Sequence, residues 1–514
     1  MYLILSASKD AYITDKIING AFRATDANTG RAGTLDLFKL YDESSISGTG
    51  APVELSRALV QFDLSQLHAL TGSVLDITDP SFRCQLSLRD VNGTQSVPRN
   101  FNLIAYPLSQ SFDEGDGRDV GSFADLDVCN FLTASYSGGT AYPWFASGAG
   151  AIGLLGSPDI DIIGSGNLGS GVVQLGSSQL FSAGTEDLLI DVTQVVSGIL
   201  VGLIPDHGFR VSFVPAEEDD DRTRFVKRFG SRHSRNPFLR PSLRVTFDDT
   251  VEDNHANFIF DVTGSLLLSN YHRGVPSSIL SGTALTPVVG TDSLALTLNY
   301  LDWSKTVLAS QYTGSTTGAG LPGVYQAQLA LASADPTPVT GTVTLQDVVL
   351  ASGSVTFGEV WGSLDGTVPF YSGSLTVTAP QRVAYSPAPA SPILKVTNLQ
   401  GSYLTSDDVR VQVFGLDSRA VQNRPAKSPR SLRSEVFDAV YYRVVDSDSG
   451  EVVIPVTKQG NATRLSVESN GMYFRLLMSS LPPGRVYHFE FLVVDRGSEL
   501  ILPDKSPQFR VDAV

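Results

Sequence analysis

Short runs in which apolar and polar residues alternate, interrupted by Gly, Pro, Asn or Asp, recur along most of this chain. Leu243, Val245 and Phe247 alternate with polar residues, and residues 294–300 and 487–494 repeat the pattern. A period of two puts alternate side chains on one face of a β-strand. The scarcity of Met (3 residues) beside abundant Gly (47 residues) also favours strands and turns over helices. We therefore expect an all-β protein.

Two polar stretches divide the 514 residues, a length that suggests about three domains at roughly 150 residues each. Residues 248–255 are polar and acidic, and residues 385–392 contain three prolines, as expected of linkers. We therefore predict domains at 1–249, 250–384 and 385–514. The first is expected to be a jelly-roll-like sandwich with a Gly-rich insertion, and the other two to be immunoglobulin-like β-sandwiches.

Helical periodicity is confined to short segments of the first domain. The apolar positions of residues 192–200 follow the i, i+3, i+4, i+7 rule, and Asp191 is placed to cap the first turn. A turn or two of helix is expected at residues 63–67. The second domain, including residues 341–345, is predicted to consist of strands without helices.

The charge, the N-terminus and the cysteines argue against several classes of protein. The net charge is 37 − 53 = −16, which opposes general nucleic-acid binding. No window approaches about 18 consecutive apolar residues, so membrane insertion is not expected, and the N-terminus lacks the basic segment of a signal peptide. Cys84 and Cys129 are too few for a disulfide framework and are expected to be buried thiols. This combination favours a β-rich protein that is assembled in a reducing cytoplasm and released without secretion.

No catalytic residues are predicted, and we expect a protein that is not an enzyme. The sequence contains no GxSxG elbow, HExxH helix, P-loop or GxGxxG after a strand. The acidic loop 113–119 is the most site-like segment, because oxygen ligands and tight turns suit Ca²⁺. Its four carboxylates are Asp113, Glu114, Asp116 and Asp119. Arg118 opposes a cation, so the loop is either a structural Ca²⁺ site or a solvated loop, and no other cofactor is expected.

Aromatic residues mark a candidate glycan platform. Tyr136, Tyr142 and Trp144 lie in or beside the Gly-rich segment 137–178, which is expected to be a surface excursion. Exposed aromatic rings at such a position can stack on sugars. The other two tryptophans are expected in the core; they are Trp303 and Trp361.

Charged segments offer a candidate docking site. A basic loop is conspicuous on this acidic chain and is interpreted either as a solvated loop or as a docking segment for an acidic neighbour. Its cations are Arg419, Arg424, Lys427, Arg430 and Arg433. The mixed-charge block 217–235 is interpreted as a solvated hairpin.

Several motifs of the first half occur in the order found in one family. They are Asp10-Ala-Tyr-Ile-Thr14, Asn28-Thr-Gly30, Gly33-Thr-Leu-Asp-Leu37, residues 56–64, Phe112-Asp-Glu-Gly115, Asp191-Val-Thr193, Gly208-Phe-Arg-Val211, Phe229-Gly-Ser-Arg232 and residues 240–247. In these motifs, residues 1–247 resemble the carbohydrate-binding-like β-sandwich modules known by a DNRLRE signature. His233 stands where that signature has glutamate.

The resemblance implies a jelly-roll-like sandwich and a carbohydrate-binding ancestry, although no sugar-contacting residue matches one by one. The motif residues Arg57, Asp63, Asp191 and Arg232 are interpreted as structural. The carboxylates would cap short helices, and the arginines would anchor corners of the sandwich by forked hydrogen bonds.

The C-terminal part resembles uncharacterised virion structural proteins of tailed phages, in segments such as Tyr441-Tyr-Arg-Val-Val-Asp446 and Gly471-Met-Tyr-Phe474. We therefore expect a non-enzymatic component of the tail, baseplate or neck, present in multiple copies and bound to other virion proteins. Its place would be the virion, assembled in the host cytoplasm and released by lysis. Two alternatives stay open: a carbohydrate-binding adhesin or fibre module that recognises host surface polysaccharide, and a head decoration protein.

Overall fold

The computed structural model confirms the predicted fold class, an all-β chain of several β-sandwich domains. Strands make up 50% of the chain and helices 9%. The structure describes residues 1–20, 22–41, 53–71, 74–91, 97–121, 127–169, 171–273, 275–282, 285–313, 320–380, 391–418, 434–468, 471–495, 497–502 and 507–513. None of the helices in this part of the chain is both long enough and apolar enough to cross a bilayer.

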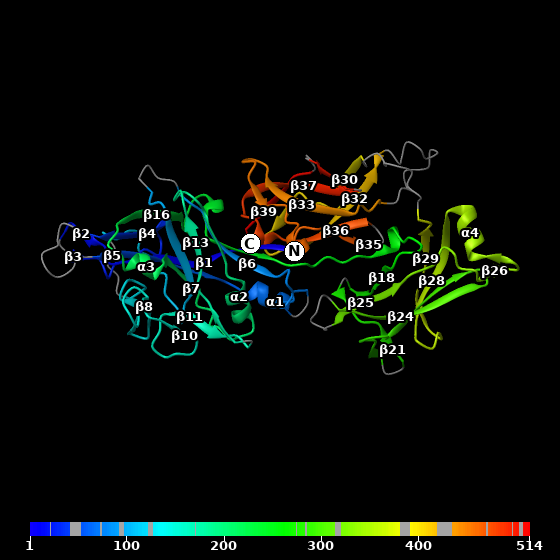
Figure 1. Cartoon of the computed structure of the whole chain (residues 1–514), viewed down its shortest axis with the longest axis horizontal. Coiled ribbons are helices and arrows are strands. Elements are labelled where there is room, and N and C mark those ends of the chain that lie inside the picture. Colours follow the sequence, from blue (N-terminus) through cyan, green and yellow to red (C-terminus); the bar gives the residue numbers. More distant parts are fainter. Residues whose placement is uncertain are drawn as a thin grey trace. The chain divides into compact units, whose positions relative to one another are not determined.

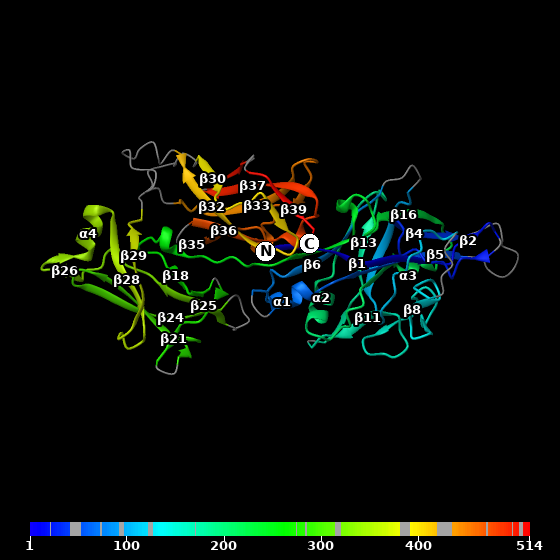
Figure 2. The same ribbon diagram turned by 180° about the vertical axis from the view of Figure 1, so that it is seen from behind.

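The chain forms two compact units, which Figures 1 and 2 show from opposite sides. Unit 1 comprises Met1–Tyr2, Leu70–Ser81 and Phe247–Val514, and unit 2 comprises Leu3–Ala69 and Phe82–Thr246. Within unit 1, the backbone N–H of Asp248 donates to Ser81 Oγ at 3.0 Å. Unit 2 ends at Thr246, close to the predicted boundary at 249/250. The predicted boundary near 385 lies outside the described residues.

Unit 2 is built on one rolled sheet. Its path runs β13-β7-β15-β5-β1-β17-β6-β14, with β4 paired to β5 and β16 paired to β4. The ends of the path meet, because Gln179 of β13 accepts a hydrogen bond from Leu189 N of β14 (2.6 Å) and donates one to Asp187 O (2.8 Å). The strands are β1 (Tyr2–Thr14), β4 (Thr34–Tyr41), β5 (Val53–Phe62), β6 (Arg83–Leu88), β7 (Phe101–Pro107), β13 (Ser177–Phe181), β14 (Leu188–Asp191), β15 (Phe209–Phe213), β16 (Arg224–Gly230) and β17 (Ser242–Thr246).

The Gly-rich segment contributes to the core of unit 2, so it is more than the surface excursion expected from its composition. Trp144, Ala149 and Ile162 pack in one buried cluster with Leu59 and Tyr106. Short strands carry these residues or lie beside them: β8 (Thr133–Ser137), β9 (Thr140–Pro143), β10 (Ile152–Leu154), β11 (Ile162–Asn167) and β12 (Val172–Gln174). A separate hairpin joins β2 (Ile17–Ile18) and β3 (Phe22–Arg23).

Both predicted helices of unit 2 are present, and each predicted carboxylate accepts the N–H of the first helical residue, although the N-cap position of α2 is Val192 and makes no side-chain cap hydrogen bond. Asp63 Oδ1 accepts the N–H of Ser65 at the start of α1 (Ser65–Thr71), at 2.9 Å. Asp191 Oδ1 accepts the N–H of Thr193 at the start of α2 (Thr193–Leu200), also at 2.9 Å. Because a first-turn N–H has no partner inside the helix, these contacts satisfy it. Two further short helices are α3 (Pro215–Glu218) and η2 (Pro237–Leu239).

The middle part of the chain, within unit 1, forms a six-stranded sheet. Its order is β18-β25-β24-β23-β28-β29. Trp303 and Trp361 are buried in its core, as predicted. The strands are β18 (Gly264–Ser269), β23 (Leu294–Tyr300), β24 (Trp303–Thr313), β25 (Gly320–Leu329), β28 (Ser354–Gly362) and β29 (Pro369–Thr378), with η3 (Asn254–Ala256) before them. Hairpins pair β19 (Tyr271–His272) with β20 (Val275–Pro276), β21 (Leu280–Ser281) with β22 (Thr286–Pro287), and β26 (Pro338–Thr340) with β27 (Val343–Thr344).

A helix in this middle part contradicts the prediction that it contains strands alone. Residues 341–345 were expected to be a strand, but the strand stops at Thr344 and α4 (Leu345–Ser352) follows. Thr344 and Asp347 form a capping box, in which each side chain accepts the backbone N–H of the other. Gly353 ends the helix with φ 69°, a left-handed conformation that glycine adopts without strain.

The C-terminal part of unit 1 is a sandwich of two sheets. One has the order β30-β32-β36-β35, and the other has the order β31-β39-β37-β33-β34 with β38 paired to β37. Tyr442 of β33 stacks on Phe474 of β36 with ring centroids 4.1 Å apart, which packs one sheet on the other. The strands are β30 (Pro392–Val396), β31 (Ser402–Leu404), β32 (Asp408–Asp417), β33 (Ala439–Asp446), β34 (Val452–Ile454), β35 (Ser466–Glu468), β36 (Gly471–Leu477), β37 (Arg485–Asp495), β38 (Ser498–Leu502) and β39 (Phe509–Asp512), with η5 (Gln459–Asn461) and η6 (Met478–Ser480).

Candidate functional site

Asn28 holds several of the sequence motifs of unit 2 together. Its Nδ2 donates to the carbonyl oxygens of Glu114 and Cys129, both at 2.8 Å, and its Oδ1 accepts the N–H of Gly117 at 2.7 Å. A Cβ atom at Gly30 would lie 2.0 Å from the carbonyl oxygen of Glu114, so only glycine fits there. These contacts fix the loop that carries Glu114.

Three titratable side chains meet beside this loop. Asp10 comes from β1, Glu114 from the loop after β7, and His233 from the segment after β16. One carboxylate oxygen of each acid and one ring nitrogen of His233 lie within 4.8 Å of one another. His233 Nε2 is 3.6 Å from Glu114 Oε1. In the described ranges, no other group of three or more His, Cys, Asp or Glu residues meets this criterion.

Burial shifts the pKa values of Asp10 and His233. Asp10 is 1% exposed; its Oδ2 accepts the backbone N–H of Arg232, but its Oδ1 has no hydrogen-bond partner. Burial raises the pKa of Asp10 to about 7. His233 Nε2 is also buried without a hydrogen-bond partner, and burial lowers the pKa of His233. Two residues of this trio therefore each carry a buried polar atom without a hydrogen-bond partner, which is unusual in a folded protein.

Arg232 anchors this corner as predicted for a forked arginine. Its Nε donates to Glu114 Oε1 and its Nη2 donates to Glu114 Oε2. The backbone N–H of Asp10 also donates to Glu114 Oε1, at 2.9 Å. The fork orients the Glu114 carboxylate and neutralises one of the two acids.

The calcium loop predicted from the sequence does not form a ligand cluster. Asp113 accepts the backbone N–H of Tyr136 at 2.8 Å, and Asp116 pairs with Arg31 at 2.7 Å. Only Glu114 belongs to a group with converging ligand atoms. The structure therefore does not bring together the ligand atoms of the predicted set, Asp113, Glu114, Asp116 and Asp119: Asp113, Asp116 and Asp119 contact other groups.

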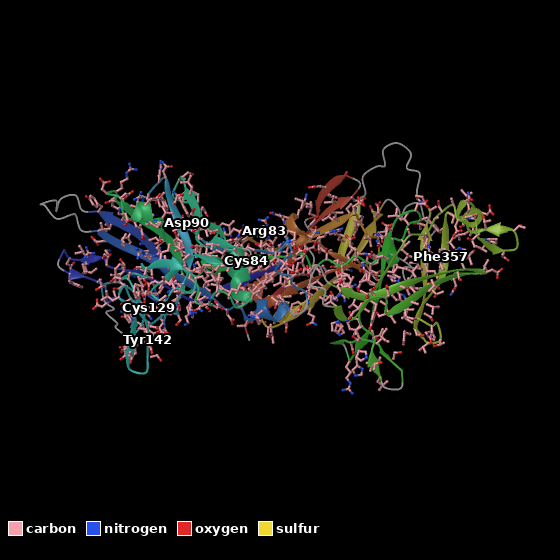
Figure 3. All side chains as sticks on the ribbon, turned by 60° about the horizontal axis from the view of Figure 1, so that its bottom comes forward. Arg83, Cys84, Asp90, Cys129, Tyr142 and Phe357 are labelled. Carbon is pink, nitrogen blue, oxygen red and sulfur yellow. The ribbon has the colours of Figure 1, made fainter. Side chains whose placement is uncertain are left out.

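The predicted glycan platform is wrong for Trp144. This ring is only 4% exposed, and its Nε1 donates to Asn130 O at 2.9 Å, so the indole serves the core. Tyr142 is 50% exposed and lies toward the outer edge of unit 2 in Figure 3, and Tyr136 is half-buried. Phe145, which no sequence pattern singled out, is 61% exposed.

The residues of the predicted docking loop lie outside the described ranges. These are Arg419, Arg424, Lys427, Arg430 and Arg433.

Part of the mixed-charge block is buried, which corrects its interpretation as a wholly solvated hairpin. Arg57 forms a fork with Glu218, at 3.0 and 2.7 Å, and these side chains are 9% and 8% exposed. Lys227 is fully buried; its Nζ pairs with Asp90 and lies 4.9 Å from the centre of the Phe229 ring. The fork predicted for Arg57 is thus confirmed, although the partner of Arg57 lies 161 residues away in sequence.

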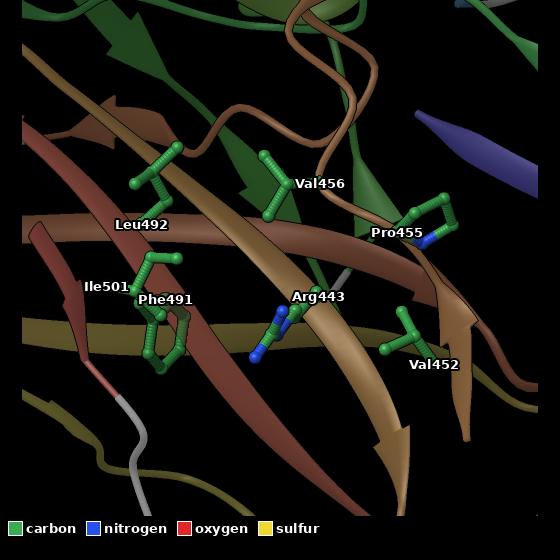
Figure 4. Close-up of a pocket in the computed structure, with 7 residues that line it drawn as sticks. All are labelled: Arg443, Val452, Pro455, Val456, Phe491, Leu492 and Ile501. Atoms are coloured by element: carbon green, nitrogen blue, oxygen red, sulfur yellow. The ribbon is translucent and has the colours of Figure 1, made fainter. Parts of the chain in front are cut away.

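An apolar hollow of about 330 Å³ lies on the C-terminal sandwich (Figure 4). Its lining residues are Arg443, Val452, Pro455, Val456, Phe491, Leu492 and Ile501. The guanidinium of Arg443 pairs with Glu490. The hollow therefore offers apolar contact with little polar recognition, whereas binding sites for small molecules combine both.

Comparisons with known proteins do not assign this chain to a family. No protein-family model and no curated protein matches it. Among solved structures, it is similar to the N-terminal Ig1-2 module of the Drosophila receptor protein tyrosine phosphatase DLAR, with 8% identity, 49% of this chain and 90% of that chain covered, and a TM-score of 0.14. A putative membrane anchored protein from Corynebacterium diphtheriae has 9% identity, with 100% and 96% covered and a TM-score of 0.15. The chicken CNTN1 FN1-FN3 domains have 9% identity, with 58% and 82% covered and a TM-score of 0.14. TM-scores this low carry no conclusion about function.

Proposed function

We propose that this chain is a non-catalytic structural protein of a tailed-phage particle, which binds neighbouring virion proteins through surfaces of its β-sandwich domains. The favoured location is the tail, baseplate or neck of the particle. The alternative is a role in decorating the head. The proposal rests on the sequence resemblance of the C-terminal part and on an exposed apolar hairpin in unit 1. Buried thiols at Cys84 and Cys129, outside any disulfide, fit assembly in a reducing cytoplasm.

The hairpin of β21 and β22 carries the proposal. Leu280, Leu285 and Val289 are 50%, 63% and 56% exposed within ten residues of one another. Figure 1 shows β21 in the green middle part of the chain, at its lower edge below β24. Apolar side chains grouped in this way on a soluble surface are typical of contacts with other proteins.

The test uses particles assembled with variants of this chain. We expect mass spectrometry to find the chain in purified particles, and a Leu280→Ser, Leu285→Ser, Val289→Ser triple variant to be depleted from them at least about tenfold, the effect of roughly 1.4 kcal/mol of lost contact energy. Leu350→Ser is the matched control, because Leu350 is 76% exposed on α4 of the same domain. Absence of the wild-type chain from particles, or equal incorporation of the triple variant and the control, would overturn the proposal.

Glycan recognition is the second candidate function, favoured by the exposed rings of Tyr142 and Phe145. Aromatic faces that are three residues apart and open to solvent can stack on sugar rings. Glycan-array binding that is lost in Tyr142→Ala and Phe145→Ala, with unchanged thermal melting, would support this function. Absence of binding by the wild-type chain would exclude it for the glycans on the array.

A further inference from the structure

The corner formed by Asp10, Glu114 and His233 has the features of a cation site. Asp10 is 1% exposed, and its Oδ1 has no hydrogen-bond partner although it is fully inside the protein. His233, a second residue of the same cluster, also has a buried atom without a hydrogen-bond partner, Nε2. Leaving a buried polar atom unpaired costs about 1–3 kcal/mol, so two such atoms in one place point to a missing ligand.

The spacing of the ligand atoms suits a small cation. Two ligands of a tetrahedral zinc ion at about 2.0–2.1 Å are separated by about 3.3 Å. His233 Nε2 and Glu114 Oε1 are 3.6 Å apart, and all three ligand atoms lie within 4.8 Å of one another. Small side-chain rotations would bring them to coordination distance.

We propose that Asp10, Glu114 and His233 bind one divalent transition-metal ion, of which Zn²⁺ is the probe. The imidazole nitrogen selects this class, because Ca²⁺ and Mg²⁺ take oxygen ligands, whereas Zn²⁺, Co²⁺ and Ni²⁺ bind imidazole well. Three protein ligands leave a fourth position for water. The inference is independent of the proposed function.

The charge of the corner permits a divalent cation. The formal charges of the Asp10 and Glu114 carboxylates and the Arg232 guanidinium sum to −1 when His233 is neutral. One bound Zn²⁺ ion would bring the formal charge of the corner to +1. Arg232 acts here as a positioning residue, since its fork holds the Glu114 carboxylate in place. The same fork competes for the carboxylate oxygens, so the site is expected to be weaker than one built from three unshared ligands.

Bound metal would join three segments that are distant in sequence. Asp10 lies in β1 and is 104 residues from Glu114 in sequence. Arg232, the residue before His233, is 222 residues from Asp10 in sequence. A ligand that binds only the folded chain stabilises it by mass action, by about 2.7 kcal/mol at a concentration of 100 times Kd. The ion is therefore assigned a structural role in unit 2.

The experiment titrates the untagged full chain, freed of metal with EDTA and then dialysed, with ZnCl₂ in a calorimeter and with CoCl₂ in a spectrophotometer. We expect one Zn²⁺ per chain, a rise in melting temperature with Zn²⁺, and visible d–d absorption with Co²⁺. His233→Gln and Asp10→Asn should each weaken Zn²⁺ binding at least tenfold. His68→Gln and Asp219→Asn are matched controls on exposed residues of unit 2 and should bind as wild type does.

Several outcomes would overturn the proposal. They are absence of Zn²⁺ and Co²⁺ binding by the wild-type chain, wild-type affinity in His233→Gln, and loss of binding in His68→Gln. Ca²⁺ binding as tight as Zn²⁺ binding and unaffected by His233→Gln would overturn the metal class. His233→Gln keeps the test decisive even if Asp10→Asn fails to fold, because the His233 side chain is 29% exposed and Asp10 is 1% exposed.

Discussion

His255 Nε2 lies 3.0 Å from Glu359 Oε1, and His255 Nδ1 contacts Asp253, so the imidazole bridges two carboxylates in unit 1. Glu359 is 1% exposed and also accepts a hydrogen bond from Trp361 Nε1. Burial alone would lower the pKa of His255, but the hydrogen bonds to Asp253 and Glu359 outweigh burial and raise the pKa to about 9. The imidazole is therefore charged at neutral pH.

This bridge predicts a pH dependence of stability. The folded pKa lies above the ordinary value of 6.5, so the stabilisation is fully present below about pH 6.5 and is lost as pH rises through about 9. A shift of this size corresponds to about 3 kcal/mol. Urea unfolding followed by tryptophan fluorescence at about pH 6 and about pH 9.5 should show this loss in the wild type and in His272→Gln, an exposed control, but not in His255→Gln. Equal pH dependence in all three proteins would contradict the prediction.

The buried fork of Arg57 and Glu218 predicts strong coupling between these residues. Arg57→Met leaves the carboxylate of Glu218 buried without its partner, which should cost about 3–5 kcal/mol of unfolding free energy. Replacing both residues, as Arg57→Met with Glu218→Leu, should restore most of this loss. Urea unfolding of the single and double variants measures the coupling. A double variant no more stable than Arg57→Met would show that the fork is not the dominant interaction.

The contrasting burial of Trp144 and Tyr142 predicts opposite effects of truncation. Trp144→Ala opens a cavity and removes the hydrogen bond from the indole Nε1 to Asn130 O, so it should cost about 3–5 kcal/mol. Tyr142→Ala removes a ring that is 50% exposed and should change stability by no more than about 0.5 kcal/mol. Thermal melting by circular dichroism distinguishes them. Similar melting temperatures for the two variants would argue against the buried position of Trp144.

The two thiols provide a probe that reports on unit 2 alone. Cys84 and Cys129 are 0% and 1% exposed, both lie in unit 2, and burial raises the pKa of Cys84. Reaction with Ellman's reagent should be at least about 10³-fold slower in the native protein than in urea, because it requires unfolding. Two equivalents should react after denaturation. A fast native phase would show that a thiol is accessible.

Local patterns in the sequence predicted the strands and the helix caps, because their causes lie within a few residues. The period of two marks the strands, and Asp63 and Asp191 each accept the N–H of the first helical residue two positions on. The missed helix α4 also had a local signal, the Thr344-x-x-Asp347 capping box with Gly353 after the last turn. The alternation in residues 341–345 concealed it, since a short apolar run fits either structure.

The candidate site was predicted only in part, for a physical reason. Glu114 was singled out by the density of acids around it, but its partners come from other strands. Asp10 is 104 residues from Glu114, and no period or motif within one segment encodes that proximity. The burial of Trp144 likewise depends on which sheet face the Gly-rich segment covers, which composition does not reveal.

The division of the chain into units has a consequence for proteolysis. The backbone passes between unit 1 and unit 2 four times, after Tyr2, Ala69, Ser81 and Thr246. A protease that cuts only after Thr246 would leave a fragment 1–246 that still carries residues 70–81 of unit 1. We therefore expect the two fragments of a nicked chain to stay together on a native gel and to part only in denaturant, as a complementing pair.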